Sequence, residues 1–180
     1  MAKRESQNGF TLIEIMIVVA IIAVLAAIVI PQWSKSAQKG KADPEIRAMF
    51  GEIQMKEEQY RSEQGGAYTN LSLCPLAVNA AGVDLASQAC FSGGWVNAHI
   101  LPTDKQIRCT YQVVADPGSN NAGAAINVPS GFTLPANAAN YTGAWYYVLG
   151  TCDMDGQGGT NATFLSSSWD TSVQKQNYGQ

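Results

Sequence analysis

The chain has 180 residues, with 11 Lys and Arg against 14 Asp and Glu, and a net charge of −3. A basic nucleic-acid binder would carry clustered positive charge, so no sequence-specific nucleic-acid partner is expected. Charged residues make up only 14% of the chain, against roughly 25% in ordinary soluble domains. With one His, no metal-ligand spacing and no Gly-rich phosphate loop, the sequence predicts neither an enzyme nor a bound cofactor.

An apolar run covers residues 10–30, where only Thr11 and Glu14 are not apolar. As an α-helix this run would be about 31 Å long, which matches the hydrocarbon core of a bilayer. Lys3 and Arg4 precede it, which favours an N-terminus in the cytoplasm with the rest of the chain across the membrane. A cleaved secretory signal is the alternative, but its apolar region would be about 7–15 residues and would end at an A-x-A site. No such site occurs near the run.

Gly9 is a small residue on the cytoplasmic side of the run, and a cut after it would leave the apolar helix on the mature protein. The cut would create an α-amine at Phe10, four residues before Glu14. A carboxylate at the centre of a bilayer costs about 2.5–3.5 kcal/mol, and less near an end. Glu14 therefore either snorkels or is protonated, or it pairs with the ammonium of a neighbouring, staggered copy. Pairing with the ammonium of a neighbouring copy would set the axial register of the copies.

The segment GFTLIEIMIVVAIIAVLAAIVIP, from Gly9 to Pro31, resembles the N-terminal signature of type IV prepilins, especially type IVa pilins with a short basic leader. A looser similarity continues to about Tyr60. The resemblance implies that a prepilin peptidase cuts between Gly9 and Phe10 and methylates the amine of Phe10. It also implies that Glu14 is the assembly glutamate and that Pro31 bends the helix.

The resemblance implies four parts: a cleaved leader over 1–9, a transmembrane and polymerisation helix over 10–30, its amphipathic continuation over 31–63, and a disulfide-containing head over 64–180. The expected function is a structural subunit of a type IV pilus that serves motility, adhesion or DNA uptake. Its partners would be further copies in a helical homopolymer, the prepilin peptidase, the inner-membrane assembly platform and membrane lipid. The precursor would lie in the inner membrane with its head in the periplasm, and the assembled form in a cell-surface pilus.

Two alternatives share this N-terminus or its apolar helix. One is a pseudopilin of a type II secretion system or a minor pilin. The other is a membrane-anchored binding domain that never polymerises, for which Gly9 would stay uncleaved and Glu14 would be dispensable.

After the apolar run, Asp43 and Pro44 indicate a helix restart, with Asp43 as N-cap. Glu57 and Arg61 have the spacing of a favourable surface ion pair. The helix should end near Gly65. An apolar stripe at helical spacing is expected to face the core, and it consists of Ile46, Met49, Phe50, Ile53 and Tyr60.

The remaining residues read as strands separated by loops rich in Gly, Asn, Ala and Pro. The strand candidates are Trp95–Leu101, Ile107–Ala115, Ala144–Thr151 and Ala162–Trp169. An antiparallel sheet of these strands, packed on the stripe, gives an α+β fold with a long N-terminal helical spine, as in pilins.

Four cysteines lie in the head, which is therefore expected outside the cytoplasm, where disulfides persist. Three connectivities are possible and the sequence does not choose among them. We favour Cys74–Cys90, closing the loop after the helix, with Cys109–Cys152 joining two strands.

A weak calcium candidate follows the last cysteine, at Asp153 and Asp155. A complete calcium loop needs further acids and a terminal Glu, so a simple turn is the favoured interpretation and no metal is expected.

Overall fold

The computed structural model describes residues 10–79, 81–102, 105–116, 126–138, 141–154, 156 and 158–178. The expected leader with Gly9 lies outside the described residues, and so does Asp155. Inside the first helix, the side chains at positions 31–32, 34–36 and 38–39 lie outside the description too.

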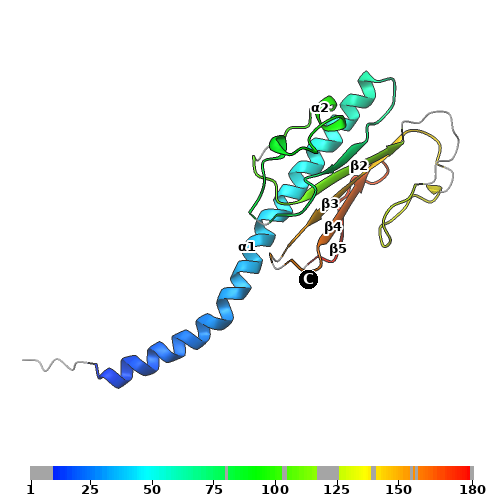
Figure 1. The fold of residues 1–180 in the computed structure, drawn as a ribbon. Coiled ribbons are helices and arrows are strands. Elements are labelled where there is room, and N and C mark those ends of the chain that lie inside the picture. Colours follow the sequence, from blue (N-terminus) through cyan, green and yellow to red (C-terminus); the bar gives the residue numbers. More distant parts are fainter. Residues whose placement is uncertain are drawn as a thin grey trace, which may run out of the picture.

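One long helix, α1, runs from Leu12 to Glu63 (Figure 1). Its 52 residues span about 78 Å at the usual rise of an α-helix. The chain leaves the helix through Gly65 and Gly66, whose φ values of 68° and 102° suit glycine. Figure 1 shows the second half of α1 lying along the head, while the first half curves away from it.

The predicted helix restart at Asp43 is wrong, because α1 continues through Pro31 and Pro44. A proline inside a helix removes one backbone hydrogen bond. Around Pro44 the lost hydrogen bond is offset by packing of α1 against the head. The buried residues of the helix begin at Ala42. Asp43 does not cap a helix; it holds two cations, as described below. The expected bend at Pro31 stays a prediction.

The head contains a five-stranded antiparallel sheet with the strand order β1-β2-β3-β4-β5. Its central strands pair in register, with Val113 opposite Val148 and Leu149 opposite Leu165. The strands are β1 (Leu71–Cys74), β2 (Thr110–Asp116), β3 (Trp145–Cys152), β4 (Ala162–Ser167) and β5 (Gln174–Gln176).

The predicted strand Trp95–Leu101 is wrong. This segment begins with a short helix, α2 (Gly94–Asn97), which follows a 3-10 turn, η1 (Leu85–Ser87). Trp95 and Ala98 are buried while the two residues between them are exposed, which is a helical spacing. The indole of Trp95 donates to the carbonyl of Ser72 at 2.7 Å and so attaches α2 to β1.

The core lies between α1 and one face of the sheet. Gly150 in β3 permits the close approach of the helix, because a Cβ there would come within 2.7 Å of Ile46 Cδ1 and 2.9 Å of Phe50 Cε1. The helical stripe is buried as predicted except for Tyr60, which is only partly covered. The sheet contributes Tyr111, Val113, Tyr146, Val148 and Phe164 to this core.

The opposite face of the sheet is covered by the connection between β2 and β3. Ile126 and Phe132 from this connection pack on Trp145, Tyr147 and Leu165. The Tyr147 hydroxyl donates to the carbonyl of Asn127 at 2.8 Å and helps to hold the connection in place. The β-sheet is therefore buried on both faces.

Two disulfides reinforce the head, Cys74–Cys90 and Cys109–Cys152, which is the pairing favoured from the sequence. They close segments with sequence separations of 16 and 43 residues. The first ties the end of β1 to the segment before α2, and the second joins β3 to the residue before β2. Both contribute to a head that is rich in loops.

Candidate assembly site on the first helix

The first half of α1 presents an apolar surface that nothing in the described structure covers. Leu12–Ile30 is long and apolar enough to cross a membrane, and none of it is buried. The large apolar side chains from Phe10 to Ile30 are between 50 and 83% exposed. Soluble monomers rarely expose an apolar surface of this extent, so this half of the helix needs lipid or protein around it.

Glu14 lies at the start of this apolar surface and caps its own helix. The backbone N–H of Glu14 donates to the Thr11 hydroxyl at 3.3 Å, while the Glu14 carboxylate accepts from the backbone N–H of Thr11 at 3.2 Å. The Thr11 hydroxyl also lies 3.1 Å from the same carboxylate oxygen. This capping box satisfies two donors at the helix start and holds the carboxylate at the end of the apolar segment. Thr11 had not been assigned this role, although T-L-I-E is the spacing that signals it.

The other expected site residues lie apart from this end. Phe10 precedes the capping box and is 83% exposed, while the paired cysteines all lie in the head. The Asp153 carboxylate accepts the backbone N–H groups of Gly156 and Gly158 at 2.8 and 3.1 Å, as expected of a turn. No cluster of metal-ligating side chains occurs among the described residues.

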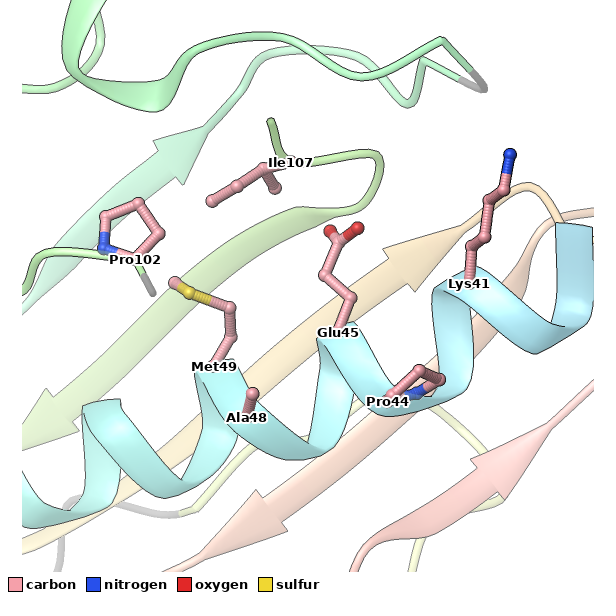
Figure 2. Close-up of a pocket in the computed structure, with 7 residues that line it drawn as sticks. All are labelled: Lys41, Pro44, Glu45, Ala48, Met49, Pro102 and Ile107. Atoms are coloured by element: carbon pink, nitrogen blue, oxygen red, sulfur yellow. The ribbon is translucent and has the colours of Figure 1, made fainter. Parts of the chain in front are cut away.

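Glu45 attaches the second half of α1 to the head. In Figure 2 its side chain points from α1 toward the segment that carries Ile107. The carboxylate accepts the backbone N–H groups of Arg108, at 2.8 and 3.0 Å, and of Cys109, at 2.9 Å. It also accepts the Tyr111 hydroxyl at 3.0 Å and lies 3.5 Å from Arg108 Nη1. Burial, together with this carboxylate, raises the pKa of Tyr111 well above its ordinary value.

A pocket of about 220 Å³ opens beside this attachment (Figure 2). Its lining is largely apolar, with the Glu45 carboxylate as its acid. That carboxylate is already saturated with donors from the chain itself. Its arrangement therefore explains how the helix is held, and not how a ligand would bind. The lining residues are Lys41, Pro44, Glu45, Ala48, Met49, Pro102 and Ile107.

Asp43 makes a second attachment, between α1 and the last strand. Its carboxylate accepts from Lys175 Nζ at 2.8 Å and from Arg47 Nε at 3.0 Å. The hydrogen bond from Lys175 is the main cause that lowers the pKa of Asp43. Lys175 also lies 4.2 Å from the centre of the Tyr178 ring. The chain's C-terminal strand is thereby tied to the helix where the free half of α1 begins.

Glu57 makes a third attachment, at the far end of the helix. Its carboxylate accepts the backbone N–H of Thr69 at 3.0 Å, and the residue is fully buried. The predicted Glu57–Arg61 pair is wrong: Arg61 lies 3.6 Å from Glu58 instead and donates to the Tyr68 hydroxyl at 3.0 Å. Burial raises the pKa of Glu57 from 4.5 to about 7.

Comparison with known proteins shows similarity over parts of the chain. Residues 4–30 match the prokaryotic N-terminal methylation motif. The chain is 38% identical over 98 residues to the type IV major fimbrial protein FimA of Dichelobacter nodosus, covering 54% of this chain and 49% of FimA. It is 36% identical over 90 residues to the type IV major pilin protein PilE of Neisseria gonorrhoeae, covering 50% of this chain and 48% of PilE. Over these segments the chain is similar to type IV pilins.

The chain matches FimA and PilE over longer stretches than the methylation motif alone. It is also 43% identical over 56 residues to the type II secretion system core protein G of Pseudomonas aeruginosa, covering 29% of this chain and 39% of that protein. The chain spans about half the length, or less, of these relatives. No solved structure gave a significant match.

Proposed function

We propose that this chain is a type IV pilin, made as a membrane-bound precursor, that polymerises into a type IV pilus for motility, adhesion or DNA uptake. A prepilin peptidase removes residues 1–9 by cutting between Gly9 and Phe10, and the new amine of Phe10 is methylated. The observation that carries the proposal is the apolar half of α1, whose large apolar side chains are at least half exposed, while the other half of the helix is fixed to the head.

The apolar half has two ways to leave water. Before assembly it crosses the inner membrane, with the disulfide-bonded head in the periplasm, where such bonds persist. In the filament it packs against the same helix of other copies. Exposure to water would cost about 1.5–3 kcal/mol for each large apolar side chain, so both environments are strongly favoured. A contact repeated between identical copies without closure produces an open fibre.

Glu14 sets the register of the copies in this proposal. Apolar helices can slide along one another, whereas a charge pair has one favourable axial position. The carboxylate lies at the beginning of the apolar segment and is bonded there to Thr11. In the filament, the ammonium of Phe10 from a neighbouring copy, delivered by the inner-membrane assembly platform, pairs with it.

Replacing Glu14 with alanine tests this role. Glu14→Ala should insert into membranes at the normal level but give few filaments, because the register-setting charge is lost. The matched control is Glu63→Ala, which removes an exposed carboxylate at the other end of α1. Electron microscopy and the yield of sheared filaments measure the outcome. Abundant filaments composed only of Glu14→Ala subunits would contradict the proposal.

A bulky residue at Gly9 tests the processing step. Gly9→Leu should leave the chain at its precursor mass, because the junction must enter a peptidase site. Mass spectrometry of the membrane fraction measures this directly. A normal mature mass for Gly9→Leu would argue against cleavage at this junction, and so would an unprocessed wild-type chain in a cell that contains the peptidase.

A second candidate function is a pseudopilin of a type II secretion system, which the similarity to core protein G favours. A minor pilin would have the same N-terminal chemistry. Localisation separates these candidates from the major subunit. A major pilin is recovered as the bulk of filaments sheared from the cell surface, whereas a pseudopilin stays in the membrane fraction and its loss stops secretion.

A further inference from the structure

A basic segment follows the apolar span and has no assigned role. We name residues 33–41 of α1 the basic neck; it contains Lys35, Lys39 and Lys41 and no acid. The helix continues through the neck. Trp33, at its beginning, is 74% exposed, and Lys41, at its end, is exposed too.

The distances along the helix place the neck at a membrane surface. With a rise of about 1.5 Å per residue, Trp33 lies about 4.5 Å beyond Ile30, and Lys35 lies about 7.5 Å beyond it. The headgroup layer on each side of a bilayer is about 5–8 Å thick, so both positions fall within it when Leu12–Ile30 spans the core. Tryptophan is enriched at this level. Lys41 lies about 16 Å beyond Ile30. Its distance from the outer edge of the headgroup layer is therefore about one Debye length, so its charge still acts on the headgroups.

The charge of the neck is unusual for its side of the membrane. Lys and Arg are ordinarily in excess on the cytoplasmic side of a span. Here Lys3 and Arg4 precede the span, whereas three lysines follow it within 11 residues. The three lysines after the span do not contribute to the orientation that Lys3 and Arg4 favour, and they need another explanation.

The nearest acid on the head side of the neck is not available to neutralise it. Asp43 already accepts from both Lys175 and Arg47. A segment with three lysines and no acid of its own is suited to binding anions outside the chain. At the depth that the helix gives it, the nearest dense layer of anions is the phosphates of the lipid headgroups.

We propose that the basic neck binds anionic phospholipid headgroups in the leaflet beneath the head and thereby sets the depth of the unassembled pilin. This inference rests on the proposed function only in requiring that the chain spans a membrane. Each lysine that reaches the surface should strengthen the preference for anionic lipid about fivefold. Trp33 anchors the same level through its exposed ring.

The test compares lipid preference in the full-length pilin. Wild type and the double variant Lys35→Gln/Lys39→Gln are reconstituted into bilayer discs that contain phosphatidylcholine and phosphatidylglycerol. Native mass spectrometry counts the lipids of each type that stay bound. The matched control, Lys56→Gln/Lys105→Gln, removes the same charge from positions on the head side of the molecule. Carbonate extraction of membranes reports separately on insertion.

The proposal predicts that wild type and control retain phosphatidylglycerol preferentially, that salt weakens this preference, and that the neck variant loses at least about fivefold of it. Equal lipid preference in wild type and neck variant would overturn it. So would a neck variant that keeps its lipids but fails to form filaments, because the lysines would then serve contacts between copies. A wild-type pilin released by carbonate would instead contradict the membrane span of the proposed function.

Discussion

Glu57 occupies a position on α1 that faces the core of the head, and its replacement by glutamine should stabilise the protein at neutral pH. The carboxylate is fully buried and bonded to the backbone N–H of Thr69. Its second oxygen, Oε1, is buried with no hydrogen-bond partner in the described structure. Glutamine keeps the size of the side chain and an acceptor for Thr69, and it removes the charge.

The magnitude follows from the pKa of this group. Burial raises the pKa of Glu57 from 4.5 to about 7, so the folded state prefers the protonated acid. Below pH 4.5 the acid is protonated both folded and unfolded and costs nothing extra. Between pH 4.5 and about 7 the unfolded chain loses this proton while the folded state keeps it, so stability falls across this range. Above about pH 7 the loss is constant at about 3 kcal/mol, which is the difference between the two pKa values.

The assay is urea unfolding of the full chain in detergent micelles, followed by tryptophan fluorescence across the pH range. Glu57→Gln should raise the free energy of unfolding by about 3 kcal/mol at pH 8 and leave it unchanged at pH 4. The matched control is Glu63→Gln, an exposed acid near the same helix end, which should have little effect at either pH. A Glu57→Gln protein that is less stable at pH 8, or equally stabilised at both pH values, would refute the reasoning.

Three other predictions use the same unfolding measurement. Glu45→Ala should lower the free energy of unfolding by about 3–5 kcal/mol, because it leaves the buried donors and the charge of Arg108 unpaired; a loss below 1 kcal/mol would contradict this. Gly150→Ala should cost about 1–3 kcal/mol through overpacking against α1, and an unchanged midpoint would show that the helix can move aside. Removing Cys109–Cys152 as an alanine pair should cost about 4 kcal/mol, against about 3 kcal/mol for Cys74–Cys90, because it closes the longer segment; the reverse order would exclude this explanation.

The parts of the fold that follow from local patterns could be predicted from the sequence. Burial at helical spacing is the clearest case, because it can be predicted without knowing which strands pack on the helix. The residues concerned are Ile46, Met49, Phe50 and Ile53. Strand β2 could also be predicted, because its apolar residues alternate, whereas β3 is buried on both faces. Short strands such as β5 (Gln174–Gln176) carry no such pattern, since they are three to four residues long and polar or mixed.

The contacts that hold α1 to the head could not be predicted, because their partners are distant in the chain. Glu45 is satisfied by backbone groups of Arg108 and Cys109, more than sixty positions later. Glu57 has the same spacing to Arg61 as a surface pair, and only the approach of Thr69 shows that it is buried. A carboxylate that is buried and one that is solvated can therefore have identical local sequence.

The central claim of this account is that the apolar half of α1 builds a surface filament from processed subunits. The most direct test is the intact mass, under non-reducing conditions, of this protein sheared from cell surfaces and of the protein left in membranes. The account predicts that the sheared species begins at a methylated Phe10 and has all four cysteines oxidised. A chain that keeps its first nine residues in every fraction, and is absent from the sheared material, would contradict the account.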